Sequence, residues 1–240
     1  MKRFHFLLYM IISSAFGVSC KADDADPSRF VKQREAMIRT QIESRGIRDL
    51  ATLNALRKVE RHKFVPQKYQ NHAYEDHPLP IGEDQTISQP YIVALMTQVL
   101  DLKKNEKVLE VGTGSGYQAA VLAEICDHVY TIEIIDILGR RAQKVLADLG
   151  YKNVNVKIGD GYKGWEKHSP FDAIIVTCAP THIPEPLKNQ LAEGGKMVIP
   201  VGKTFAQELV LLTKENGEII RKAIIPVRFV PMLGENGKKY

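Results

Sequence analysis

The chain has 240 residues, of which 44% are hydrophobic and 25% are charged. This length suits one globular domain with an elaborated end, or one domain with a small appendage, and the composition argues against a disordered or membrane-spanning chain. The formal net charge is +5, but the lysines and arginines are scattered and no run of five or six forms a basic arm. We therefore expect no nucleic-acid partner.

The first twenty residues differ from the rest of the chain. The basic start MKR is followed by an apolar stretch of about 15 residues, then by GVSC and the polar KADDADPS. This stretch suits a signal-peptide core and is short for a membrane span. Residues 1–20 are thus a candidate signal or lipoprotein leader, processed at Cys20, with a linker over 21–28. A hydrophobic N-terminal helix and a mis-assigned start codon are the alternatives.

Two helices and a long loop are predicted after the linker. Residues 27–46 carry apolar residues at helical spacing and end in a glycine. Asp49 is a candidate N-cap for a second helix over 48–60. Residues 61–90 are rich in His, Pro, Gly and Asp, which indicates a functional loop or a lid. A buried helix is predicted over 90–100, with a proline in its first turn.

From Glu106 the pattern changes to short β-branched strands that alternate with helices. Strands are predicted over 107–111, 128–134, 154–160, 171–178 and 194–201, and helices over 116–126, 137–149 and 183–192. This alternation predicts an α/β fold with a doubly wound, mostly parallel Rossmann-like sheet. An Asn-Gly turn at 216–217 predicts an antiparallel C-terminal hairpin at the sheet edge. We expect this core over 101–240, behind a helical N-terminal cap over 29–100.

A glycine-rich loop follows the first predicted strand of the core. The strand KVLEV leads into Gly112, Gly114 and Gly116, where glycines allow the backbone to approach a ligand closely. Such a loop fits dinucleotides as well as other adenosine ligands. Glu110 beside the loop is poorly placed for a pyrophosphate and well placed for a cationic ligand.

Two further carboxylates follow the next two strands. Glu133 lies 23 positions after Glu110, where an acidic residue accepts hydrogen bonds from ribose hydroxyls. Asp160, in GDG, is placed to accept the amino group of adenine. A ligand with ribose, adenine and positive charge but no phosphate has the properties of S-adenosyl-L-methionine. Its predicted binding residues are Glu110, Gly112, Thr113, Gly114, Gly116, Glu133, Asp160 and Gly161.

The cysteines and histidines predict neither a disulfide framework nor a metal site. Cys126 and Cys178 stand alone without CxxC spacing, and the seven histidines are dispersed. We interpret Cys178 as a buried packing residue.

Several motifs resemble those of known enzymes. VLEVGTGSGYQAAVLAE, GDGYKGW, FDAIIVTCAP and LAEGGKMVIPVG are similar to the ordered motifs of class I S-adenosyl-L-methionine-dependent methyltransferases. GIRD, FVP, DHPLPIGEDQTISQPYIVALM and RFVPM resemble, more specifically, the protein-L-isoaspartate O-methyltransferase family. The resemblance covers about residues 33–234. QTISQP is specific to that family, whereas the glycine loop is shared across the superfamily.

The resemblance implies methyl transfer to the free α-carboxylate of L-isoaspartyl residues in damaged peptides and proteins, which starts their repair. It implies that Ser88, the serine of TIS, is the active-site residue. We assign Ser88 to orienting the substrate carboxylate, with Thr86 assisting, because a hydroxyl is a poor base at neutral pH. The alternative is that Ser88 is the N-cap of the helix that begins at Pro90.

The resemblance also implies a monomeric, cytoplasmic enzyme without stable membrane insertion of the core. Export to the periplasm, with lipid anchoring at Cys20, is the alternative if residues 1–20 are a true leader. Asp84 departs from the family, in which many relatives carry glycine, and this leaves its effect on specificity open. Arg228 has two interpretations, one as a partner of a substrate carboxylate and one as a structural residue.

Three other functions remain open from the sequence. The chain can be a methyltransferase of a small carboxylate, although the polar loop and RFVP suit a peptide better. It can also be a non-catalytic module that binds S-adenosyl-L-methionine or a nucleotide. A dinucleotide oxidoreductase is the third alternative, and the glycine loop speaks against it because Tyr117 stands where the last glycine of GxGxxG would fall.

Overall fold

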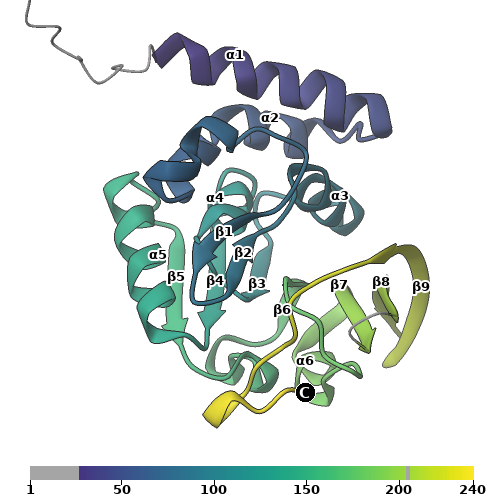
Figure 1. Cartoon of the computed structure of the whole chain (residues 1–240). Helices are drawn as coiled ribbons and strands as arrows, with labels where there is room; N and C mark the ends of the chain where they lie inside the picture. Colours follow the sequence, from purple (N-terminus) through teal and green to yellow (C-terminus); the bar gives the residue numbers. More distant parts are fainter. Residues whose placement is uncertain (1–26, 204–205) are drawn as a thin grey trace, which may run out of the picture.

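The structure is a computed structural model that describes residues 27–203 and 206–240. The predicted leader, residues 1–20, lies outside the described residues. Figure 1 shows a twisted sheet with helices on both sides and the N-terminal helices together at one end. No helix in the described part combines the length and the apolar composition needed to cross a membrane.

Within residues 27–203 and 206–240, the main sheet has seven strands in the order β5-β4-β3-β6-β7-β8-β9. The strands are β3 (Lys107–Val111), β4 (His128–Glu133), β5 (Val154–Ile158), β6 (Phe171–Val176), β7 (Leu191–Lys203), β8 (Ala206–Glu215) and β9 (Glu218–Val227). The pairs among β5, β4, β3, β6 and β7 are parallel, whereas β8 and β9 are antiparallel. The predicted fold class, including the antiparallel C-terminal hairpin, is confirmed.

The hairpin between β8 and β9 follows from its turn residues. Asn216 and Gly217 both have positive φ, at 53° and 80°. A two-residue turn with this geometry matches the right-handed twist of the flanking strands, which is why Asn-Gly favours it. Strand β9 ends at Val227, earlier than the predicted run to Met232, and the chain then leaves the sheet.

Helices follow the parallel strands as predicted. They are α4 (Tyr117–Ala123) after β3, α5 (Asp136–Asp148) after β4 and α6 (Glu185–Asn189) after β6. The side chains of β3 pack on both faces of the sheet. Val108 belongs to the hydrophobic core that includes the N-terminal helices, whereas Leu109 and Val111 belong to the core on the opposite face. The prediction for α6 was too long because the chain joins β7 at Leu191, which pairs with Phe171.

The N-terminal cap agrees with the helices read from the sequence. Helix α1 (Pro27–Met37) continues through a π-helical turn and a 3₁₀ turn, and it ends at Gly46 in the left-handed conformation. Helix α2 (Leu50–Lys58) is capped by Asp49, whose carboxylate accepts a hydrogen bond from Thr52 N at 2.8 Å. The predicted N-cap is therefore confirmed.

The segment predicted as a loop contains regular structure. Two 3₁₀ turns, Arg61–Phe64 and Gln67–His72, precede an antiparallel hairpin of β1 (Leu79–Gly82) and β2 (Gln85–Ile87). The sequence prediction missed this hairpin because its strands are only four and three residues long and the first contains a proline. Three buried apolar side chains hold it on the core, namely Leu79, Ile81 and Ile87.

Helix α3 (Pro90–Leu100) begins two residues after Ser88, which ends the TIS motif. Its N-cap is Gln89, and no side chain forms a cap hydrogen bond. The alternative interpretation of Ser88 as an N-cap residue is therefore wrong. The proline at the first helical position needs no hydrogen-bond acceptor there, since it has no N–H.

The turn between β1 and β2 gives the first testable prediction. Glu83 and Asp84 both adopt positive φ, at 52° and 54°. This region is unfavourable for glutamate and better tolerated by aspartate. We expect Glu83→Gly to raise the free energy of unfolding by about 0.5–1 kcal/mol, and Asp84→Gly to raise it less. Urea unfolding of the two variants measures this, and a larger gain from Asp84→Gly would contradict the strain ascribed to Glu83.

Candidate active site

A cavity lies at the carboxyl ends of β3 and β4, beneath the β1–β2 hairpin. It encloses about 780 Å³, part of it open to solvent. Its wall includes the glycine loop between β3 and α4, the end of β2, and residues 230–233 after β9. Ligands of α/β proteins bind at this edge of the sheet.

The glycine loop brings backbone atoms to the cavity wall. Gly112 has a φ of 101°, and its N–H donates to Ile132 O at 2.9 Å. A side chain at this position would overlap with Thr177 Oγ1, so only glycine fits. Gly112, Thr113 and Gly114 line the cavity. Gly116 does not, since it precedes α4 and packs against Leu146 of α5.

Glu110 places a buried carboxylate on the cavity wall. Its Oε2 accepts from Thr131 Oγ1 at 2.6 Å, and Thr131 Oγ1 is also 2.6 Å from Thr113 Oγ1. The other oxygen, Oε1, has no hydrogen-bond partner within the described residues. Burial raises the pKa of Glu110 to about 8. A buried, half-satisfied carboxylate of this kind suits a cationic or hydrogen-bond-donating ligand.

Glu133 joins the next strand to the glycine loop. Its Oε2 accepts from Gly114 N at 2.7 Å, and its Oε1 accepts from Ile135 N at 3.0 Å. Burial raises the pKa of Glu133. The side chain lines the cavity, and each oxygen retains a lone pair for a further donor, such as a ligand hydroxyl.

Asp160 lies behind the cavity wall, whereas its neighbour Gly161 lies on it. Asp160 Oδ1 accepts from Tyr162 N at 3.0 Å, and Oδ2 accepts from Tyr240 Oη at 2.7 Å. Sequence reasoning did not identify Tyr240, because nothing in the local pattern links it to a residue 80 positions earlier. An aromatic residue near the carboxyl end was the only signal.

Thr86 and Ser88 lie where the cavity meets an open groove. The groove is formed by the end of β2, the start of α3 and residues 226–231. Five residues line both hollows, namely Thr86, Ser88, Thr177, Val230 and Pro231. Neither the Ser88 hydroxyl nor the Thr86 hydroxyl has a hydrogen-bond partner among the described residues. Both are therefore available to a bound molecule. Arg228 also lines the groove.

A fully buried arginine holds the backbone of Ser88. Arg61 Nη2 donates to Ser88 O at 2.7 Å, and Arg61 Nε donates to Ala73 O at 2.7 Å. The guanidinium also lies 4.8 Å from the centre of the Tyr117 ring. Burial lowers the pKa of Arg61 to about 10, which leaves the group charged at neutral pH. Arg61 thus links Ala73 and Ser88, which lie before and after the β1–β2 hairpin in the chain.

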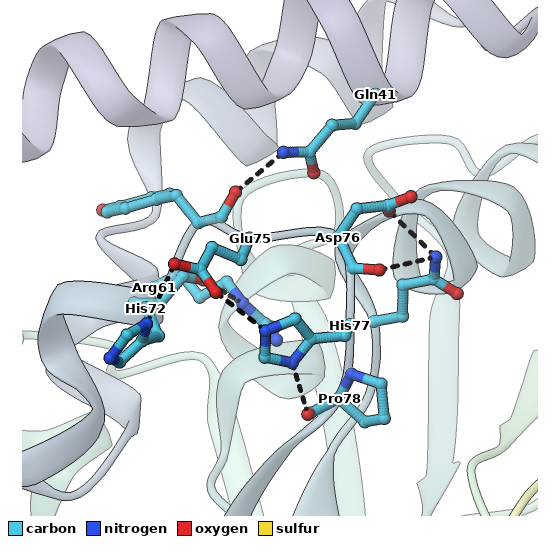
Figure 2. Close-up of polar contacts among 10 residues, drawn as sticks. Gln41, Arg61, His72, Glu75, Asp76, His77 and Pro78 are labelled. Atoms are coloured by element: carbon cyan, nitrogen blue, oxygen red, sulfur yellow. Dashed lines mark hydrogen bonds and ion pairs between the residues drawn. The ribbon is translucent and has the colours of Figure 1, made fainter.

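Polar contacts fix the part of this segment that precedes β1. Figure 2 shows Glu75 between two histidines, with its oxygens 2.9 Å from His72 Nδ1 and 2.9 Å from His77 Nε2. Asp76 accepts from Gln89 Nε2 at 2.9 Å, which connects the segment to the residue after Ser88. Hydrogen bonds to the Pro78 carbonyl and to Glu75 raise the pKa of His77.

The cysteines of the described part are unpaired. Cys126 is buried, whereas Cys178 is partly buried, packs against the core on one face of the sheet as predicted, and also lines the cavity. Burial raises the pKa of the Cys178 thiol, which keeps it protonated and unreactive. In residues 27–203 and 206–240, no group of three His, Cys, Asp or Glu side chains is arranged to hold a metal ion.

The raised pKa of Glu110 predicts a pH-dependent stability. Between its ordinary value of 4.5 and about 8, the folded protein retains a proton that the unfolded chain has lost, so Glu110 lowers stability as the pH rises through this window. Glu110→Gln removes this effect. We expect the stability of the variant relative to the parent to increase by on the order of 3 kcal/mol between pH 4.5 and pH 8. Parallel pH profiles in chemical denaturation would contradict this.

Comparison with known proteins agrees with this geometry. The family described as Protein-L-isoaspartate(D-aspartate) O-methyltransferase (PCMT) matches residues 32–237. A protein-L-isoaspartate O-methyltransferase of Opitutus terrae is 54% identical over 204 residues, which cover 85% of this chain and 88% of the relative. One of Gloeobacter violaceus is 51% identical over 205 residues, covering 85% of this chain and all of the relative.

Solved structures give the same result. A protein-L-isoaspartate O-methyltransferase superimposes with a TM-score of 0.77 at 29% identity, covering 87% of this chain and 67% of that one. A PCMT protein of Plasmodium falciparum, in complex with S-adenosyl-L-homocysteine, has a TM-score of 0.72 at 27% identity and covers 85% of this chain and 97% of its own. The chain therefore belongs to the protein-L-isoaspartate O-methyltransferase family.

Proposed function

We propose that this protein transfers a methyl group from S-adenosyl-L-methionine to the free α-carboxylate of L-isoaspartyl residues in damaged peptides and proteins, which initiates their repair. The observation that carries the proposal is the position of Thr86 and Ser88 on the wall shared by the enclosed cavity and the open groove. A methyl donor in the cavity and a peptide in the groove would meet at these two hydroxyls.

The residues around the cavity fit the proposed donor. When bound, S-adenosyl-L-methionine supplies an electrophilic methyl group on a sulfonium centre. The free oxygen of Glu110 suits the cationic end of that molecule, and Glu133 suits its ribose hydroxyls. Asp160 would accept the adenine amino group from behind Gly161. The residues proposed to bind it are Glu110, Gly112, Thr113, Gly114, Glu133, Asp160 and Gly161, and Gly116 supports the loop from behind through its packing against Leu146.

Ser88 and Thr86 act on the carboxylate rather than on a proton. A carboxylate is already ionised at neutral pH, so the reaction needs no strong base. Ser88 donates a hydrogen bond to one carboxylate oxygen and directs the other toward the methyl group, with Thr86 assisting. Orientation of this kind supplies about 7–11 kcal/mol in well-aligned systems. The following backbone amide nitrogen then attacks the ester carbonyl, methanol leaves, and a succinimide forms. Hydrolysis of the succinimide returns some sites to the normal aspartyl linkage.

We also propose a monomer that acts in the cytoplasm, without a metal, a nucleic-acid partner or stable insertion of its core in a membrane. The cytosol is where S-adenosyl-L-methionine is made, which supports this location. The scattered basic residues support the absence of a nucleic-acid partner. A periplasmic enzyme anchored at Cys20 is the alternative, and a lipid-modified Cys20 detected by mass spectrometry would establish it.

Two peptides that differ in one linkage test the proposed reaction. One carries an L-isoaspartyl residue and the other an L-aspartyl residue in the same sequence. With methyl-labelled S-adenosyl-L-methionine and the full-length protein, we expect base-labile label on the isoaspartyl peptide alone. Label on both peptides or on neither, in a preparation that binds the donor, would reject isoaspartyl specificity.

Ser88→Ala tests the role of the shared wall. Loss of the Ser88 hydroxyl as a hydrogen-bond donor should lower kcat/KM for the isoaspartyl peptide by about tenfold to a hundredfold. The affinity for S-adenosyl-L-methionine should stay unchanged. Ser44→Ala is the matched control, because the exposed Ser44 hydroxyl donates to Thr40 O in the N-terminal cap, away from the site. Full activity of Ser88→Ala would remove Ser88 from the mechanism.

A further inference from the structure

The chain after β9 returns from the sheet edge to the cavity. In Figure 1 this yellow segment passes the end of β6 before it turns back toward the mark at the C-terminus. Backbone hydrogen bonds attach it beside β6, since Ala179 N donates to Val230 O at 2.8 Å and Met232 N donates to Ala179 O at 2.9 Å. Residues 230–233 thereby become part of the cavity wall.

Residues 234–240 fold back over the end of this wall. Tyr240 N donates to Met232 O at 3.2 Å, and Thr181 N donates to Tyr240 O at 2.9 Å. The Tyr240 ring stacks on Tyr162, with ring centres 4.1 Å apart and planes at 23°. A side chain at Gly234 would overlap with the Tyr240 ring, so the ring lies flat against the backbone there. Tyr240 is held by the backbone on one side and by Tyr162 on the other.

This arrangement directs the Tyr240 hydroxyl toward Asp160, the residue predicted to accept a hydrogen bond from the adenine amino group. The hydroxyl donates to Asp160 Oδ2 at 2.7 Å, and Tyr162 N donates to Oδ1 at 3.0 Å. The bond to Asp160 raises the pKa of Tyr240 to about 12, so the hydroxyl remains a donor at neutral pH. Lys163 Nζ also lies 3.9 Å from Oδ2. With one hydrogen-bond donor on each oxygen, the carboxylate has a fixed orientation and a lone pair remains on each oxygen.

We propose that Tyr240 is a positioning residue that fixes Asp160 as a hydrogen-bond acceptor and so makes the cavity select adenine over hypoxanthine. The proposal rests on the proposed function, because it presupposes an adenosyl ligand. Adenine presents an amino group at its 6-position, whereas hypoxanthine presents an oxygen. The hypoxanthine oxygen and the fixed oxygens of Asp160 are all hydrogen-bond acceptors. Neither group can donate to the other, so both would remain unsatisfied.

Binding of two ligands to two proteins tests this without turnover. The ligands are S-adenosyl-L-homocysteine and its inosine analogue, and their Kd values are measured by calorimetry for the parent protein and Tyr240→Phe. The parent should prefer the adenine ligand by about tenfold or more. Tyr240→Phe keeps the stacked ring and loses the hydroxyl. We expect this variant to raise the Kd of S-adenosyl-L-homocysteine by about threefold to tenfold and to leave the Kd of the inosine analogue almost unchanged.

Two further variants separate positioning from a structural role. Asp160→Asn should also reduce the preference for the adenine ligand. Combining it with Tyr240→Phe should reduce that preference little further, because both changes act through one contact. Lys239→Gln is the control, since it removes an exposed charge from the same segment without altering a contact of Asp160 and should leave the preference unchanged.

Each result has one interpretation. Equal weakening of both ligands by Tyr240→Phe would indicate a structural role and overturn the inference, as would unchanged Kd values. In both cases, binding of S-adenosyl-L-homocysteine to the parent protein would leave the proposed function standing. A parent protein that binds neither ligand would overturn the proposed function and this inference together.

Discussion

The site depends on the close approach of the chain after β3 to the chain after β6. Thr177 Oγ1 donates to Gly112 O at 2.7 Å, and no side chain fits at position 112. Parallel pairing brings the carboxyl ends of β3, β4 and β6 to one edge, so the glycine loop can lie flat across them. Glu110 and Glu133 then reach a single cavity from adjacent strands. A larger residue at position 112 would lift the loop and separate the two carboxylates from the backbone donors between them.

Arg61 attaches the other half of the site to this core. No carboxylate in the described part of the chain forms an ion pair with it, so a charged guanidinium is buried with only carbonyl oxygens and the Tyr117 ring as partners. Burial of a charge without a counter-ion is unfavourable, and such groups are found where they have a positioning or functional role. Two hydrogen bonds to Ala73 and Ser88 offset part of this cost and hold the hairpin and Ser88 beside the cavity, while Nη1 has no partner among the described residues.

Local patterns in the sequence predicted most of the core. Strand-helix alternation, the Asn-Gly turn and the Asp49 cap each depend on neighbouring residues, and the carboxylates at strand ends follow from the topology. The β1–β2 hairpin could not be predicted in this way, because its register is set by the burial of Leu79, Ile81 and Ile87 against distant elements. The contacts of Arg61 with Ser88 and of Tyr240 with Asp160 join residues 27 and 80 positions apart, and no local pattern encodes them.

The distribution of charge matches the proposed reaction. Glu110 and Glu133 line the cavity, whereas the buried guanidinium of Arg61 donates to the carbonyl of Ser88 on the wall that the cavity shares with the groove. A cationic methyl donor would favour the ionised form of both glutamates, because a bound positive charge lowers their raised pKa values, and the buried charge of Arg61 adds a longer-range attraction for an anionic carboxylate. Methyl transfer converts the sulfonium to a thioether and the carboxylate to an ester, so both attractions weaken in the same step. The electrostatic attraction that brings the reactants together is therefore weaker for the products, which favours their release.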